Sequence, residues 1–296
     1  MKKKLLKYYP SKLLLFGEYA VIDGSTALAM PFEKFKSKWS FNHKRINKEF
    51  TPFIEYLRNI DWNKYSEIFQ FDKLKNDIDS GLYFESNIPV GYGAGSSGSL
   101  TAAIYDNYFE KNDDDIKKIR DTLSLIEGYF HGISSGIDPL VSFLNKSIKI
   151  INKDDFEIIK DANFKLESFN LYLLDSNIKR ETKKYVNIYN KEIKTENFIS
   201  ENLNLLISLN NKIISSFLIK DENMTFSLWK EISLLQYHFF KKMIIPSLTN
   251  LWKQSIQSDD FSIKLCGAGG GGFYLIIAKN GFNIKSFFND FKLIKI

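Results

Sequence analysis

The segment Pro89-Val-Gly-Tyr-Gly-Ala-Gly-Ser-Ser-Gly98 constrains the fold of this chain more than any other. Its glycines allow positive φ angles and let the backbone come close to another group. A strand-like stretch in residues 81–90 leads into it, and a helix-like stretch follows over residues 100–109. The first turn of such a helix offers free backbone N–H groups and a positive dipole end, which together bind phosphate. We therefore predict a phosphate-binding loop, with hydroxyls of Ser96 and Ser97 that reach a phosphate or a hydrated Mg²⁺.

Other interpretations of this glycine-rich loop fit the sequence less well. A Walker A loop ends in Gly-Lys followed by Ser or Thr, and no lysine is present here. The pattern G-x-G-x-x-G over residues 93–98 is typical of dinucleotide-binding loops. That pattern needs a second strand about 20 residues on, where this sequence instead predicts a helix. A tight strand-to-helix turn without a ligand would not need so many glycines or the pair of serines.

A second glycine-rich segment, Gly267-Ala-Gly-Gly-Gly-Gly272, has a different context. It also fits G-x-G-x-x-G, but the strand-like run Phe-Tyr-Leu-Ile-Ile follows it instead of a helix. We expect a turn that contacts a ligand or another loop. A hairpin with a structural role only is the alternative.

Hydrophobic periodicity predicts an α+β chain in two halves. Ile116, Ile119, Leu123, Ile126 and Phe130 share one face of a helix, and the carboxylates of residues 113–115 suit its first turn. The pattern further predicts strands over residues 12–16, 170–175, 262–266 and 273–278, and helices near 201–218 and 223–242. Strands and helices alternate without a strict βαβ rhythm, which favours α+β. The polar stretch 145–165 is the expected boundary between the halves.

Composition excludes several classes of protein. The chain has 296 residues, 44% of them hydrophobic, so it can bury a sizeable core. Its single cysteine and three histidines exclude a disulfide framework and a Cys/His zinc site. No apolar run approaches the length of a membrane span. The net charge of +6 comes from scattered lysines with four arginines, which does not favour nucleic-acid recognition and suits a small anionic substrate. No targeting signal is evident, so we expect a cytoplasmic protein.

Three segments together resemble the GHMP kinase family. Lys12-Leu-Leu-Leu-Phe-Gly-Glu-Tyr-Ala-Val is similar to its first motif, residues 89–98 to its phosphate loop, and Lys264-Leu-Cys-Gly-Ala-Gly-Gly-Gly-Gly to its third motif. The motifs stand in the family's order and span nearly the whole chain. The resemblance implies a ribosomal protein S5 domain 2-like N-terminal half over residues 1–150, which binds ATP, and a ferredoxin-like C-terminal half over 151–296. It places the active site between the halves.

The resemblance also implies roles for individual residues. Without it, Lys12 would be an ordinary strand-end lysine, and Glu127 and Asp138 would be capping or solvated carboxylates. With it, we expect Asp138 and Lys12 to be catalytic, and Glu127 and Ser97 to bind Mg²⁺. The ATP-binding residues would be Pro89, Gly91, Gly93, Ala94, Gly95, Ser96, Ser97 and Gly98, and the substrate-binding residues Glu18, Tyr19, Arg180, Thr182, Gly269 and Gly270.

Details of the motifs bear on the substrate. The run His131-Gly-Ile-Ser-Ser-Gly-Ile-Asp138 is similar to that of mevalonate kinases, which implies ATP- and Mg²⁺-dependent phosphorylation of mevalonate. Tyr19, where mevalonate kinases have histidine, is similar to phosphomevalonate kinases, so the alternatives are a phosphomevalonate kinase or another small-molecule kinase of the family. Further departures are Ser134 for proline, Pro139 for asparagine and Gly98 for alanine. A catalytically inactive binding module of the same fold, RNA-binding or regulatory, is the alternative of another class. The sequence leaves a homodimer open.

Overall fold

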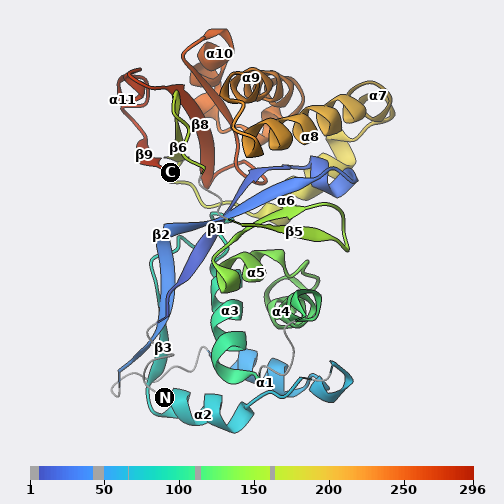
Figure 1. Ribbon diagram of the computed structural model, residues 1–296, viewed down its shortest axis with the longest axis vertical. Coiled ribbons are helices and arrows are strands. Elements are labelled where there is room, and N and C mark those ends of the chain that lie inside the picture. The colour runs from blue at the N-terminus through green and yellow to red at the C-terminus, as the bar shows by residue number, and fades with distance from the viewer. Residues whose placement is uncertain (1–6, 43–49, 66, 111–114, 161–163) are drawn as a thin grey trace. The chain divides into compact units, whose positions relative to one another are not determined.

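The computed structural model describes residues 7–42, 50–65, 67–110, 115–160 and 164–296 (Figure 1). The chain divides into two compact units that interleave along the sequence. The first comprises Met1–Lys12, Pro31–Pro89 and Ala94–Lys146, and the second comprises Leu13–Met30, Val90–Gly93 and Ser147–Ile296. The glycine-rich loop therefore crosses from the second unit to the first at the peptide bond between Gly93 and Ala94.

Strand β2 (Ala27–Phe41) is the longest in the described part of the chain and contributes to both units. In the first unit, Ser37–Phe41 of β2 pairs antiparallel with β3 (Leu82–Ser86). In the second unit, its residues 27–29 pair with β4 (Ser147–Ile150), which in turn pairs with β5 (Phe156–Ile159). Strand β1 (Tyr9–Phe16) completes the sheet in the order β1-β2-β4-β5, with β3 beside β2.

The first unit is mainly helical. Its helices are α1 (Thr51–Arg58), α2 (Phe71–Asp79), α3 (Ser96–Tyr108), α4 (Ile116–His131) and α5 (Ile137–Leu144). Helix α3 packs against both α4 and α5 (Figure 1). Helix α4 confirms the predicted periodicity at Ile119, Leu123 and Ile126, which are buried, but Phe130 at the end of the predicted face is 39% exposed. Its first turn is capped by Asp115, whose carboxylate accepts a hydrogen bond from the backbone N–H of Lys117 at 2.9 Å.

The second unit contains a four-stranded antiparallel sheet in the order β7-β8-β6-β9. Its strands are β6 (Phe169–Asp175), β7 (Phe261–Leu265), β8 (Phe273–Lys279) and β9 (Lys292–Lys295). Strand β8 is buried along its length up to Lys279, since it lies between β7 and β6. Helices α9 and α10 pack on β7, and α8 packs on α9 (Figure 1).

The helices of the second unit are α6 (Thr182–Ile188), α7 (Glu196–Phe198), α8 (Asn204–Leu218), α9 (Glu222–Phe239), α10 (Thr249–Gln257) and α11 (Ile284–Phe287). Short 3₁₀-helices occupy Ala20–Asp23, Trp62–Tyr65, Lys241–Met243 and Pro246–Leu248, and π-helical turns occupy Tyr189–Ile193 and Ile199–Leu203. Within the described part of the chain, no helix is long and apolar enough to cross a bilayer.

The α+β class is confirmed, and the predicted strands and long helices are present within a few residues of their expected ends. One feature differs from the sequence-based expectations, because helix α3 begins at Ser96 and the loop therefore ends earlier than predicted. The polar stretch 145–165, the expected boundary, contains the paired strands β4 and β5. Asp138 stands in helix α5. Of the carboxylates predicted to start α4, Asp113 and Asp114 lie outside the described residues.

Candidate functional site

The glycine-rich loop has the geometry that its sequence predicts. Gly91, Gly93 and Gly95 have φ angles of 81°, 68° and 76°, in the left-handed region that favours glycine. Gly95 is the N-cap of α3, and its carbonyl accepts a hydrogen bond from the N–H of Ser99 at 2.9 Å. Helix α3 thus begins directly after the loop. Its first-turn amides and its dipole favour an anion at this end.

Three glycines of the loop pack against residues that the sequence assigns to the site. A Cβ atom at Gly95 would lie 3.3 Å from Cβ of Lys12, and one at Gly98 would lie 2.9 Å from the backbone carbon of Asp138. A Cβ atom at Gly93 would lie 1.8 Å from Nη2 of Arg180. The glycines are therefore needed for contacts within the protein, whatever ligand the loop holds.

Lys12 and Asp138 form an ion pair in the first unit, with Nζ and Oδ1 2.7 Å apart. The lysine side chain is largely buried and the carboxylate is 35% exposed, so the carboxylate remains open to a ligand. The backbone N–H of Lys12 donates to the carbonyl of Ala94 at 3.0 Å, which attaches β1 to the glycine-rich loop. Asp138 stands in the first turn of α5, which begins after Gly136 at a φ angle of 71°.

Glu127, near the end of α4, is a buried carboxylate that two serine hydroxyls satisfy. Ser97 donates to its Oε1 at 3.0 Å and Ser134 donates to its Oε2 at 2.5 Å. His131 Nε2 lies 3.0 Å from the same Ser97 hydroxyl. Burial, and next the negative charge of Asp138, raises the pKa of Glu127 from 4.5 to about 7. This carboxyl would ionise more readily beside a bound cation.

Glu127 and Ser97 offer the oxygen ligands that a hard cation such as Mg²⁺ prefers. Among the described residues, no group of three or more His, Cys, Asp or Glu side chains could hold a metal ion without other ligands. Mg²⁺ in proteins is commonly held by one or two carboxylates together with substrate phosphates. The donor set fits that arrangement.

Glu18, which the sequence assigns to substrate binding, lies in a buried ion pair in the second unit. Its Oε1 is 2.5 Å from Nζ of Lys264, which is fully buried and also donates to the carbonyl of Leu265. The lysine ammonium stands over the rings of Phe16 and Trp229. Burial raises the pKa of Glu18, and the charge of Lys264 opposes that change. Glu18 therefore fixes β7, at the start of the second glycine segment, to the end of β1.

Tyr19 is buried and has a φ angle of 60°, which is uncommon for a residue with a side chain. Its ring packs against Tyr189 and Phe240, at centroid distances of 4.7 and 5.2 Å. Its hydroxyl donates to the carbonyl of Ala268 at 2.6 Å. Burial raises the pKa of this hydroxyl, so it remains a donor at neutral pH. The contacts attach the Gly-Glu-Tyr corner to the second glycine loop.

The other residues predicted for substrate binding also belong to the second unit. Arg180 Nη1 donates to the carbonyl of Cys266 at 2.8 Å, and burial lowers the pKa of its guanidinium. Gly269 is buried beside Met243, and Gly270 lies under the ring of Tyr185. Thr182, at the start of α6, is exposed. The second glycine loop is thus the predicted turn, and it packs against side chains of its own unit.

Each unit thus gathers part of the predicted residue set. The first unit brings together Lys12, Ser97, Glu127 and Asp138, and the second brings together Glu18, Tyr19, Arg180, Gly269 and Gly270. Two further residues take part in these contacts without having been predicted to do so, Ser134 beside Glu127 and Lys264 beside Glu18. Each carried a signal, since Ser134 departs from the proline of the family motif and Lys264 interrupts an apolar strand.

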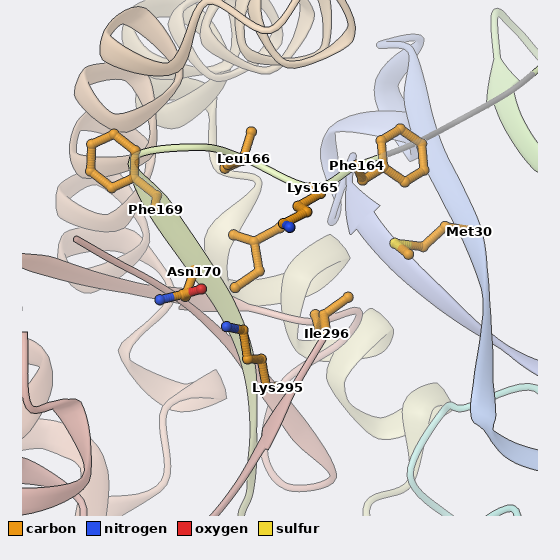
Figure 2. A pocket seen from close by; sticks show the side chains of 9 residues that line it. Met30, Phe164, Lys165, Leu166, Phe169, Asn170, Lys295 and Ile296 are labelled. Carbon is orange, nitrogen blue, oxygen red and sulfur yellow. The ribbon is translucent and has the colours of Figure 1, made fainter. Parts of the chain in front are cut away.

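A cavity of about 380 Å³ lies in the second unit, apart from these residues (Figure 2). Its wall is mainly apolar, with two lysine side chains and one asparagine (Figure 2). The lining residues are Met30, Phe164, Lys165, Leu166, Phe169, Asn170, Leu171, Lys295 and Ile296. No residue predicted for the site is among them, so the cavity does not bear on the assignments above.

The chain is similar to known proteins in sequence. Residues 63–146 match the GHMP kinases N terminal domain. Mevalonate kinase of Thermococcus onnurineus is 28% identical over 170 residues, which cover 47% of this chain and 49% of the relative. Mevalonate kinase of Methanocaldococcus jannaschii is 26% identical over 212 residues, which cover 64% and 66%. The first of these matches thus spans about half the length of the curated relative.

The fold is similar to solved structures over nearly the whole chain. A crystal structure of mevalonate kinase matches with a TM-score of 0.66 and 21% identity, and covers 97% of both chains. Phosphomevalonate kinase of Streptococcus pneumoniae, in complex with phosphomevalonate and AMPPNP, matches with a TM-score of 0.65 and 14% identity, and covers 98% of this chain and 99% of that one. At these identities the likeness shows the fold. Residues 63–146 thus match the N-terminal domain of GHMP kinases, and the whole chain has a fold similar to solved structures of mevalonate kinase and phosphomevalonate kinase.

Proposed function

We propose that this chain is an ATP-dependent kinase of a small anionic alcohol, with mevalonate as the substrate. The observation that carries the proposal is the 2.7 Å pair of Lys12 and Asp138, beside a glycine loop that opens directly into α3. A partly exposed carboxylate held next to a cation is suited to accept a proton. The loop beside it is suited to hold phosphates. Phosphoryl transfer needs both.

The nucleotide phosphates would contact the backbone of residues 93–98 and the first turn of α3. Glu127 and Ser97 would hold Mg²⁺, which neutralises charge on the phosphate oxygens when bound. The hydrogen bonds from Ser97 and Ser134 hold the Glu127 carboxylate in one orientation. Because Glu127 has a raised pKa, its full negative charge would develop when the cation binds.

Asp138 would accept the proton of the acceptor hydroxyl. General-base assistance of this kind is worth about 10²–10⁴-fold in rate. Lys12, whose Nζ lies 2.7 Å from this carboxylate, would stabilise charge on the transferred group. The contact of Asp138 with Gly98 fixes the backbone that presents it.

The acceptor would be recognised by the second unit through Arg180, Tyr19, Thr182 and the loop at Gly269 and Gly270, with Glu18 fixing the corner. An arginine can bind a carboxylate or phosphate with two parallel hydrogen bonds. The names of the sequence relatives support mevalonate as the acceptor. Phosphomevalonate is the second candidate, because the Gly-Glu-Tyr corner is similar to that of phosphomevalonate kinases. Tyr19 is held in that corner by its packing and by its hydrogen bond to Ala268.

The test is ADP release with Mg-ATP and a panel of acceptors: mevalonate, phosphomevalonate, homoserine, galactose and a blank. We expect turnover on mevalonate. Turnover on phosphomevalonate alone would assign the acceptor to the second candidate. ATP binding without turnover on any acceptor would favour a binding module. Strong RNA binding that falls steeply with salt would favour the nucleic-acid alternative.

The assignment of residues 1–150 to the ATP-binding domain and of 151–296 to the second domain is part of this proposal. A cytoplasmic location and a homodimer remain predictions, the first tested by fractionation and the second by sedimentation.

A further inference from the structure

Arg180 contacts both glycine-rich segments of the chain from within the second unit. Its Nη1 donates to the carbonyl of Cys266, directly before the second glycine loop. Its backbone N–H donates to the carbonyl of Gly91 at 2.8 Å, in the first glycine loop. One residue therefore holds two loops that lie far apart in the sequence.

The guanidinium occupies space that a side chain would fill at a glycine of each loop. A Cβ atom would lie 1.8 Å from Nη2 at Gly93 and 2.7 Å from Nη2 at Gly267. Both distances are below any contact that real Cβ atoms show, so the two glycines and the arginine are mutually dependent. Both glycines also have positive φ angles, 68° and 75°.

Gly93 is bonded directly to Ala94, whose carbonyl accepts the hydrogen bond from the backbone N–H of Lys12. Gly93 is thus the residue that precedes residues 94–98 in the loop. Arg180 supports Gly93 by direct contact and supports Gly91 by its backbone hydrogen bond. Its Nε is buried without a hydrogen-bond partner among the described residues, which costs free energy. The contacts of the guanidinium with Cys266 and Gly93 therefore have to offset this cost.

We propose that Arg180 is a positioning residue for the phosphate loop, in addition to any contact that it makes with the acceptor. The inference rests on the proposed function, because it takes residues 93–98 to bind the nucleotide. It differs from acceptor recognition in one measurable way. Loss of Arg180 weakens nucleotide binding even when no acceptor is present.

The first experiment measures the Kd of Mg-AMPPNP by calorimetry, without acceptor, for the full chain and for Arg180→Lys and Arg180→Gln. Lysine keeps the charge but cannot replace both guanidinium contacts. We expect the Kd to rise at least about tenfold in Arg180→Gln and to rise also in Arg180→Lys, since the charged hydrogen bond to Cys266 and the guanidinium packing at Gly93 are lost. Lys183→Gln, which removes one exposed charge from the same segment, is the matched control and should leave the Kd unchanged.

The second experiment is a double-mutant cycle of Gly93→Ala and Arg180→Ala on the same Kd. Gly93→Ala should weaken binding in the presence of Arg180 and have a clearly smaller effect in its absence, because the overlapping Nη2 atom is gone. Gly281→Ala controls for backbone strain in thermal unfolding, since Gly281 has a φ angle of 84° with open space around it. Additive effects across the cycle would overturn the proposal.

The outcomes separate this inference from the proposed function. If the unchanged chain does not bind Mg-AMPPNP, the proposed function fails. If it binds, and Arg180→Lys raises only the KM of the acceptor with an unchanged nucleotide Kd, the positioning role is wrong. If Arg180→Ala does not unfold cooperatively, Arg180→Lys replaces it in the cycle. A lysine side chain lacks the Nη2 atom that overlaps a Cβ atom at Gly93. Gly93→Ala should therefore raise the Kd less in the Arg180→Lys background than in the unchanged chain.

Discussion

The ammonium of Lys12 is 2.7 Å from a carboxylate oxygen of Asp138, although the two residues stand in β1 and α5. Each also packs against a different glycine of the glycine-rich loop, Lys12 at Gly95 and Asp138 at Gly98. Residues 94–98 of the loop and the ion pair are therefore packed together within the first unit. A change in either partner, or in either glycine, should affect the others.

Asp138→Asn should reduce turnover by at least about a hundredfold and leave the Kd for Mg-AMPPNP near that of the unchanged chain. Asparagine keeps the shape of the side chain but cannot accept the proton of the acceptor hydroxyl. Steady-state kinetics and calorimetry measure the two quantities. Equal rates in variant and unchanged chain would contradict the assignment of Asp138 as the base.

Gly98→Ala should destabilise the chain by about 1–3 kcal/mol, because the new Cβ atom would overlap the backbone between Asp138 and Pro139. The family has alanine at this position, so the variant also tests how far α5 can move. The turnover number should fall as Asp138 is displaced.

Gly128→Ala is the matched control, measured with Gly98→Ala by chemical denaturation. Gly128 lies within α4, where alanine is favoured over glycine, and its nearest neighbour is the end of the Tyr56 side chain. The free energy of unfolding of Gly128→Ala should change little or rise. Equal losses for the two variants would show that the contact at Asp138 has no special effect.

Glu127 should make the stability of the chain fall as the pH rises. Its pKa is raised on folding from 4.5 to about 7, so the folded chain binds this proton more tightly than the unfolded chain. The resulting stabilisation is complete below pH 4.5 and is lost as the pH rises through about 7. The Tm of the unchanged chain should therefore fall, relative to that of Glu127→Gln, between about pH 5 and pH 8.

The same comparison can be repeated with Mg-AMPPNP. A cation bound by Glu127 favours its ionised form, so the difference in Tm between the unchanged chain and Glu127→Gln should lose most of its pH dependence. Parallel pH profiles of the two chains without ligand would refute the raised pKa.

Removing one partner of the buried pair Glu18–Lys264 should destabilise the chain by about 3–5 kcal/mol, because the other charge is left buried without a partner. Lys264→Met and Glu18→Gln test this in urea. The double variant should lose less than the sum of the two single variants. Lys230→Met, in the exposed pair Lys230–Asp259, is the control and should change stability by at most about 1 kcal/mol. Additive losses in the double variant would contradict a coupled pair.

The sequence by itself determined the local features of this protein. The apolar spacing of Ile119, Leu123 and Ile126 predicted α4, and the glycines of residues 89–98 predicted a loop that enters a helix. These features are encoded within about ten neighbouring residues, where the periods of helix and strand are fixed by backbone geometry. The resemblance to a family then supplied roles for Lys12, Glu127 and Asp138.

Only the tertiary structure decided which residues meet. Glu18 and Lys264 are 246 positions apart, and no local pattern links a corner glutamate to a lysine in an apolar strand. Arg180 likewise contacts glycines of two separate loops. Such contacts depend on how strands and helices pack, and close packing leaves room at each position for a particular side chain or for none. The sequence therefore predicted that the glycines are needed for contact with a ligand. In the structure, three of them are needed because Lys12, Asp138 and Arg180 pack against them.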